Sequence, residues 1–173
     1  KVLAERGLEA VSRGLSVAVE DASLIDRFDF PPFGRGSNRA ATEVLRGSVL
    51  NENVLVFNYS FALEGERRRR GYAVTVLDAR FPWIGRLRLT SLPREGKRTV
   101  DFDDAWRLDE APPGLEILTD RVRRAVMRDR FKASAIVVVP DAVVHIEPAT
   151  TREFDLDRDI VLLKEIRAAL SSA

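Results

Sequence analysis

The alternating residues 55–63 constrain this fold more than any other part of the chain. Every second position carries a large apolar side chain: Leu55, Phe57, Tyr59, Phe61 and Leu63. The other face of the same segment is polar at Asn58, Ser60 and Glu64. A side-chain period of two is the period of a β-strand that buries one face. The pattern therefore predicts a long strand over residues 54–64.

Two more predicted strands flank this segment. Residues 42–50 and 72–79 are rich in residues that favour strands. The turns that separate the three runs, 51–53 and 65–71, are short, and short links join neighbouring strands in antiparallel order. We therefore expect a meander, to which further strands are added at residues 86–90 and 99–102.

Helices are predicted towards both ends of the chain, because apolar residues there recur at spacings of three and four. We expect helices at residues 2–13, closed by Gly14, at 22–28 behind Asp21, at 116–127, and at 156–170 behind Asp155. Residues 16–20 predict a short strand. Two β-branched runs around Pro140 and Asp141 predict a hairpin of residues 135–139 and 143–147.

Residues 30–39 interrupt this order. They contain Pro31, Pro32, Gly34 and Gly36, a composition that excludes regular structure. We expect a loop whose phenylalanines pack onto the body of the protein. The two glycines are interpreted as turn residues, because no strand precedes them and no helix with further glycines follows, as a dinucleotide-binding motif would require.

Strands occur in blocks in this chain, not in strict alternation with helices. That order favours an α+β fold over a doubly wound α/β fold. We expect an antiparallel sheet, with a meander of four or five strands plus a C-terminal hairpin, and helices packed on one face. Residues 1–173 are expected to form one domain, and a subdivision near residues 111–114 is the alternative.

The composition excludes several classes of function. The chain has no cysteine, and His145 is its single histidine, so neither a disulfide framework nor a histidine cluster is available. The formal net charge is +1 at pH 7, and so small a charge does not favour a nucleic-acid partner. No apolar stretch approaches the roughly 20 residues that cross a bilayer.

The most conspicuous charged feature is the run Arg67, Arg68, Arg69 and Arg70. It falls on the predicted turn between two strands. Guanidinium groups in this position could contact lipid headgroups or another polyanion. The alternative is a solvated hairpin tip whose like charges discourage pairing between sheet edges. Nucleic acid is not expected, because the nearby aromatic residues belong to the buried face.

Three aspartates, Asp101, Asp103 and Asp104, offer the oxygen ligands that Ca²⁺ and Mg²⁺ prefer. The glycine and the distal glutamate of a calcium loop are missing, so no metal site is predicted. We expect Asp103 to cap a helix and Asp104 to lie in its first turn. The two tryptophans, Trp83 and Trp106, are expected to pack in the core or at an edge.

His145 alternates with Val143 and Glu147 in a predicted strand. Glu147 could orient the imidazole, but no serine or cysteine nucleophile lies nearby in the sequence, so no catalytic residue is assigned. An enzyme built on carboxylates is the alternative. It requires Asp101, Asp103, Asp104 or Glu147 to converge in a cleft, with one pKa raised.

Residues 32–36 (Pro-Phe-Gly-Arg-Gly), 42–47 (Thr-Glu-Val-Leu-Arg-Gly), 56–61 (Val-Phe-Asn-Tyr-Ser-Phe) and 71–74 (Gly-Tyr-Ala-Val) resemble the pattern of a group of actinobacterial proteins of unassigned activity. That pattern is a Phe-Gly-x-Gly loop, a Val-x-x-Gly strand, a Phe-x-Tyr strand and a basic hairpin. Members often carry transmembrane helices before this region. The resemblance implies a membrane anchor upstream of Lys1, and it transfers no functional residue.

From these features we expect a non-catalytic binding or scaffolding domain of a membrane-associated bacterial protein. No cofactor or metal is expected. The expected partner is an anionic membrane surface, in contact with Arg67 to Arg70, or another protein. Pairing of two copies through a sheet edge is a further alternative, and the oligomeric state is not predicted.

Overall fold

The computed structural model describes residues 10–83, 85–92, 101–113, 116–128, 134–149 and 155–171. Its strands are β1 (Ser16–Glu20), β2 (Ser37–Val49), β3 (Glu52–Ala62), β4 (Arg70–Asp78), β5 (Leu87–Ser91), β6 (Trp106–Glu110), β7 (Ala135–Val139) and β8 (Ala142–Pro148). Its helices are the 3₁₀ helix η1 (Ala22–Leu24) and the α-helices α2 (Phe102–Ala105), α3 (Asp120–Val126) and α4 (Leu156–Leu170). The predicted α+β class is confirmed.

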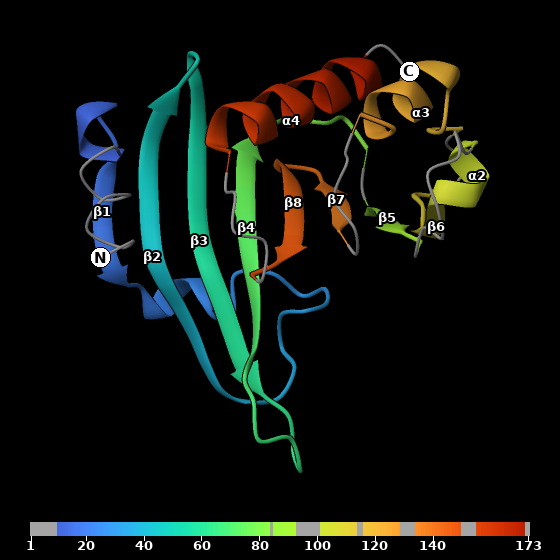
Figure 1. Ribbon diagram of the computed structural model, residues 1–173. Helices are drawn as coiled ribbons and strands as arrows, with labels where there is room; N and C mark the ends of the chain where they lie inside the picture. Colours follow the sequence, from blue (N-terminus) through green and yellow to red (C-terminus); the bar gives the residue numbers. More distant parts are fainter. Residues whose placement is uncertain are drawn as a thin grey trace.

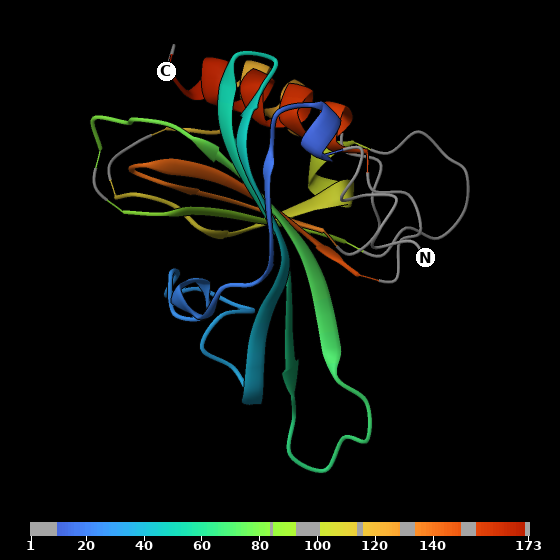
Figure 2. The same cartoon turned by 90° about the vertical axis from the view of Figure 1, so that its left-hand side faces the viewer.

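The eight strands form one antiparallel sheet in the order β1-β2-β3-β4-β8-β7-β5-β6. The three long strands of the predicted meander are present as β2, β3 and β4, and β1 pairs with β2 (Figure 1). The next predicted strand, β5, does not pair with β4. The C-terminal hairpin then lies between β4 and β5, two strands that follow one another in sequence. The segment at 111–114 falls between β6 and α3, and strands from both sides of it belong to this sheet. Figure 2 shows how strongly the sheet twists.

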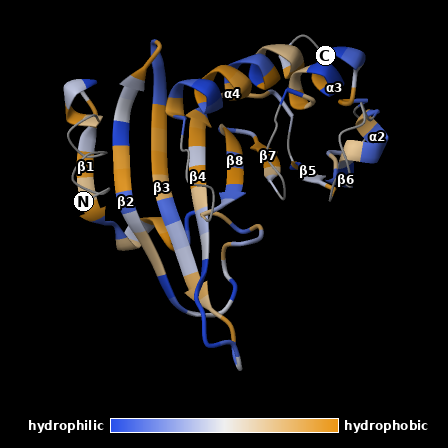
Figure 3. Ribbon diagram, viewed as in Figure 1, coloured by the Kyte–Doolittle hydropathy of each residue, from blue (hydrophilic) through white to orange (hydrophobic). Residues whose placement is uncertain are grey.

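Each face of the sheet carries its own buried cluster. On one face α4 packs with α3 over apolar residues of the sheet such as Leu87, Leu89, Ile136, Val138 and Val143. The other face carries the aromatic side chains of β3 together with Val74, Val76, Val137, Val144 and Ile146. Successive residues of one strand point to opposite faces of the sheet. Because both faces are covered, the central strands are buried on both sides, and Figure 3 colours them as largely hydrophobic.

The loop after η1 covers the second face, as predicted. Phe30 and Phe33 are buried, and the Phe33 ring centroid lies 4.6 Å from that of Tyr59 on β3. Asp21 caps η1 by accepting a hydrogen bond of 2.9 Å from the backbone N–H of Ser23. Hydrogen bonds from Ser23, together with the ion pair to Arg46, lower the pKa of Asp21 to about 2.

Several predicted boundaries were wrong. The predicted helix 22–28 is reduced to η1, because the chain turns there to place Phe28 and Phe30 in one aromatic cluster with ring centroids 5.0 Å apart. The predicted helix 116–127 begins only at Asp120, because the Thr119 hydroxyl accepts from the Val122 N–H and caps it.

The predicted strand 99–102 was also wrong where it can be checked. Phe102 begins α2, whose N-cap is Asp101 and not Asp103. Residues 99 and 100 lie outside the described residues, as do residues 2–9 of the predicted first helix. The described end of that first helix does close at Gly14, which has a φ of +78°. The strand β6 was not predicted.

The C-terminal helix α4 agrees with its prediction in both bounds. Asp155 caps it by accepting from the backbone N–H of Arg158 at 3.1 Å. Its buried stripe includes Ile160, Leu163 and Ile166. An ion pair adds to this packing: the Arg167 guanidinium donates to both carboxylate oxygens of Glu52, at 2.7 and 2.8 Å.

Candidate functional site

The hairpin between β3 and β4 projects well beyond the body of the molecule (Figures 1 and 2). The two strands pair from Val54 opposite Leu77 to Phe61 opposite Arg70. The turn that follows contains Gly65, with a φ of +79°. Figure 3 colours the turn hydrophilic. The four arginines of the run are thus displayed at the tip of a long, regular hairpin, and all four are exposed.

Two of these arginines form hydrogen bonds with other groups of the protein. The Arg69 guanidinium donates to the backbone oxygen of Asn38 at 2.5 Å and to the Ser60 hydroxyl at 3.0 Å. The Arg70 guanidinium donates twice to the Glu66 carboxylate, at 2.6 and 3.1 Å. These bonds, which Glu66 accepts, raise the pKa of Arg70 and lower the pKa of Glu66. Arg69 is therefore occupied by β2 and β3, and Arg70 by Glu66 of the turn.

Arg67 and Arg68 differ from their neighbours. Neither forms an ion pair with a carboxylate in the described ranges of the chain, and both side chains are exposed at the turn. An unpaired guanidinium on a projecting turn can approach an external anion without first breaking an internal contact. The sequence singled out all four arginines, and the structure separates this exposed pair from the hydrogen-bonded Arg69 and Arg70.

The three aspartates do not form a site with Glu147. Asp101, Asp103 and Asp104 are exposed at α2, and Asp103 pairs with Arg123 of α3 at 3.2 Å. Glu147 is buried on β8, three strands away from β6 in the sheet, which is about 14 Å at the usual strand spacing. Within the described ranges, no group of three potential ligand side chains is placed to hold a metal ion.

His145 belongs to a buried polar cluster that the sequence did not reveal. Its Nδ1 lies 3.5 Å from a carboxylate oxygen of Asp159 on α4, and the same oxygen accepts a hydrogen bond of 3.1 Å from the Thr75 hydroxyl on β4. All three side chains are at most 2% exposed. A substrate in solution therefore has no direct access to them, and the cluster holds the first turns of α4 against the sheet.

The sequence contained a signal for Asp159. It lies three residues after Leu156 and four before Leu163, on the stripe that the helical period buries. A carboxylate at such a position must be paired, because burial of an isolated charge is costly. Thr75 carried no comparable signal, since its position depends on how β4 lies beneath α4.

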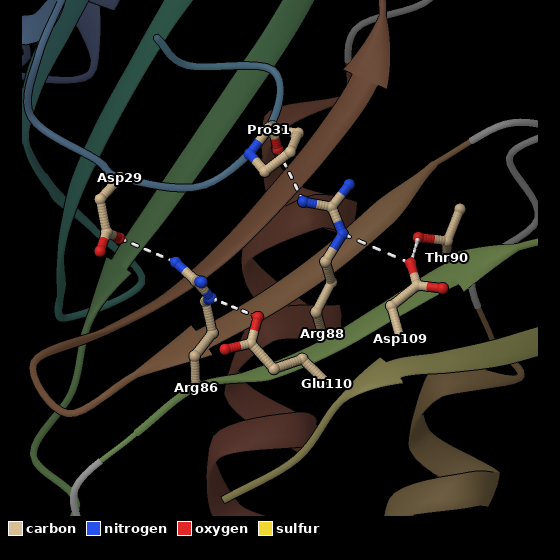
Figure 4. Close-up of polar contacts among 7 residues, drawn as sticks. All are labelled: Asp29, Pro31, Arg86, Arg88, Thr90, Asp109 and Glu110. Carbon is tan, nitrogen blue, oxygen red and sulfur yellow. Dashed lines mark hydrogen bonds and ion pairs between the residues drawn. The ribbon is translucent and has the colours of Figure 1, made fainter.

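A second polar network fastens the phenylalanine loop to the sheet (Figure 4). Arg86 bridges Asp29 of the loop, at 2.8 Å, and Glu110 of β6, at 2.7 Å. Arg88 donates to the backbone oxygen of Pro31 at 2.9 Å. The guanidinium of Arg86 also lies 5.5 Å from the centroid of the Phe30 ring, within cation–π distance.

Charges within this network are paired. The hydrogen bond that Arg86 donates to the Glu110 carboxylate raises the pKa of Arg86. Burial alone would raise the pKa of Asp109, but hydrogen bonds from Thr90 and Arg107 outweigh it, and the pKa lies below its ordinary value. Each carboxylate of the network thus lies beside an arginine, and these contacts hold the loop against the sheet.

No protein-family model and no curated protein matches this chain. Its fold is similar to the crystal structure of the mycobacterial trehalose monomycolate transport factor A, TtfA, with a TM-score of 0.71 and 15% sequence identity. The superposition covers 98% of this chain and 94% of that one. At this identity the likeness shows a common fold. None of the helices in the described ranges is both long and apolar enough to span a membrane.

Proposed function

We propose that this chain is a non-catalytic binding domain that works at a bacterial membrane surface in the transport of an envelope lipid. The observation that carries the proposal is the likeness to TtfA, because it extends over nearly the whole of both chains. The actinobacterial sequence pattern described above supports the same assignment, since members of that group often carry a membrane anchor. TtfA is a mycobacterial trehalose monomycolate transport factor.

The β3–β4 hairpin is the surface that we propose for membrane contact. Arg67 and Arg68 are exposed at the end of a projection, so a flat surface can reach them without contact to the body of the molecule. Arginine side chains near an anionic bilayer contribute about 1 kcal/mol each. The two together should strengthen binding about 30-fold, because each 1.4 kcal/mol is about a factor of ten.

Sedimentation with lipid vesicles tests this proposal. The chain should bind vesicles that contain phosphatidylglycerol and bind phosphatidylcholine vesicles far more weakly. The double variant Arg67→Gln/Arg68→Gln should lose about 30-fold in affinity for the anionic vesicles. Raising the salt to about 0.5 M should weaken wild-type binding, because the Debye length falls below about 5 Å.

The control removes two charges elsewhere. Arg80 follows the opposite end of β4, and Arg107 lies on the edge strand β6; both are exposed. The variant Arg80→Gln/Arg107→Gln should bind anionic vesicles as the wild type does. Equal binding to neutral and anionic vesicles, or an equal loss in both double variants, would contradict the assignment of the hairpin.

A further inference from the structure

The loop that leads into β2 brings a further arginine to the hairpin end of the molecule. Residues 34–38 are all exposed, and Arg35 lies among them. Figures 1 and 2 both show the start of β2 at the same end of the molecule as the β3–β4 hairpin. Arg35 forms no ion pair with a described carboxylate. In this respect it resembles Arg67 and Arg68, although it comes from a distant part of the chain.

The loop is held against β3 on both sides of Arg35. The ring of Phe33 is buried, and its centroid lies 4.6 Å from that of Tyr59. On the other side, Gly36 passes so close to β3 that a Cβ would lie 2.2 Å from the backbone oxygen of Ala62. The backbone of Arg35 is therefore fixed beside the strand that leads into the hairpin. A cation on a fixed segment loses less conformational entropy on binding than one on a mobile loop.

An arginine side chain can span the distance between this loop and the arginine run. The strands β2 and β4 pair with opposite sides of β3, so their hairpin ends lie about 10 Å apart, which is two strand spacings. The Arg69 guanidinium crosses that distance, since it donates to Asn38 of β2 and to Ser60 of β3. Arg35 lies three residues before Asn38, and Arg68 directly precedes Arg69. The loop and the turn therefore belong to one surface.

The charge of this surface is positive. Within residues 34–38 and 63–70, five arginines stand against two glutamates. The Glu66 carboxylate is paired with Arg70. Glu64 is exposed in the turn and forms no ion pair with a described cation. These two segments together therefore carry an excess of three positive charges.

We propose that the loop 34–38 and the turn 63–70 form one surface for the phosphate groups of an anionic bilayer, with Arg35 as the contact from the loop. This inference rests on the proposed function and extends the contact from one segment to two. Guanidinium groups present a planar fork of donors that matches phosphate oxygens. A bilayer is the partner that fits, because the cations are spread over the projecting end of the molecule.

A contact through both segments also fixes an orientation. Two cations on one turn allow the domain to pivot about the hairpin tip. The turn extends beyond the start of β2 (Figure 1), so Arg35 reaches the same flat surface only when the hairpin lies obliquely on it. A third cation, held on a separate segment, therefore sets the tilt of the sheet relative to the bilayer.

Sedimentation with phosphatidylglycerol vesicles tests the part played by Arg35. Arg35→Gln should weaken binding about fivefold, the contribution of one arginine near an anionic bilayer. Glu64→Gln should strengthen binding severalfold, because a carboxylate is removed from the same surface. Arg80→Gln is the matched control, since it removes one exposed charge beyond the opposite end of β4, and it should leave the affinity unchanged. All three positions are exposed, so the variants are expected to fold, and their melting temperatures check this.

A fluorescent label tests contact independently of charge. The chain has no cysteine, so one introduced cysteine can carry a single label. Ser37→Cys places an environment-sensitive dye at an exposed position two residues from Arg35. Its emission should shift to the blue when phosphatidylglycerol vesicles are added, because the label enters the headgroup region. The same dye on Arg80→Cys should show no shift.

The outcomes separate this inference from the proposed function. If Arg67→Gln/Arg68→Gln loses affinity but Arg35→Gln does not, the hairpin binds the membrane and the role of the loop is wrong. If the wild type binds no anionic vesicles, both proposals fail. Equal losses in Arg35→Gln and Arg80→Gln, or a label at position 37 that stays in water while the protein is bound, would also overturn the inference.

Discussion

Gly36 lies directly before β2, where the chain passes close to the end of β3. Its φ is +65°, and a Cβ at this position would lie 2.2 Å from the backbone oxygen of Ala62. Gly34, two residues earlier, has a similar φ of +72°, but no atom lies within 4 Å of the corresponding Cβ position. The two glycines share a backbone conformation, but only Gly36 lies so close to another strand that a side chain would clash with it.

This difference makes a prediction at the scale of the residue. Gly34→Ala should lower the free energy of unfolding by about 1 kcal/mol, the cost of a left-handed conformation. Gly36→Ala should lower it by about 3 kcal/mol, because the clash with β3 adds to the same cost. Urea unfolding measures both values. Equal losses of unfolding free energy would show that β2 and β3 can move apart at Gly36 without destabilising the protein.

At the scale of the element, α4 is fastened to the sheet by charge as well as by apolar packing. Glu52 begins β3, and its carboxylate accepts from Arg167 and lies 3.4 Å from the Lys164 ammonium. Hydrogen bonds from Arg167 lower the pKa of Glu52, although burial opposes the shift. The side chain of Glu52 is only 15% exposed, so this contact is better shielded from solvent than an ordinary surface pair.

Glu52→Gln should therefore lower the free energy of unfolding by about 1–3 kcal/mol at pH 7. The folded pKa lies below the unfolded value of about 4.3, so the contribution is complete above that pH and is lost as the pH falls below it. The difference between variant and wild type should shrink between about pH 4.5 and pH 3. Unfolding curves at several pH values measure this.

Glu66→Gln is the matched control for that experiment. Its carboxylate also accepts two hydrogen bonds from an arginine, Arg70, and its pKa is also lowered. The pair lies at the exposed hairpin tip, where water screens it. We expect no measurable change in the free energy of unfolding. A pH-independent difference between Glu52→Gln and wild type would contradict the role given to the ion pair.

At the scale of the whole molecule, β8 joins two parts of the sheet. It pairs with β4 on one side and with β7 on the other. Among the described strands, β1 to β4 are therefore joined to β5, β6 and β7 only through β8. Since β4, β8 and β7 are buried on both faces, separation of the two parts would expose a large apolar surface.

We therefore expect the chain to unfold in one cooperative transition. Both tryptophans belong to the part of the sheet beyond β8: Trp106 is in β6, and Trp83 stacks on Phe81 before β5. Tryptophan fluorescence reports on that part, whereas far-UV circular dichroism reports on all the strands. The two midpoints in urea should coincide. An earlier fluorescence transition would indicate that β5, β6 and β7 unfold as a separate unit.

The sequence determined the elements whose signals are local. The alternation at 55–63 identified β3, Asp155 and the apolar period identified α4, and Pro140–Asp141 marked the β7–β8 turn. Each of these features depends on residues within a few positions of one another, because strand and helix periods and caps are short-range properties. The position of the arginine run on a turn could be predicted from the sequence for the same reason.

The tertiary structure alone decided what depends on distant segments. The insertion of β8 and β7 beside β4, the contact of Thr75 and His145 with Asp159, and the close approach of Gly36 to Ala62 all join residues that lie far apart in the chain. It also decided that Arg69 donates to Asn38 of β2 and that Arg70 donates to Glu66. Spacing along one segment carries no information about which other segment will become its neighbour, because that choice is made by burial in the assembled sheet.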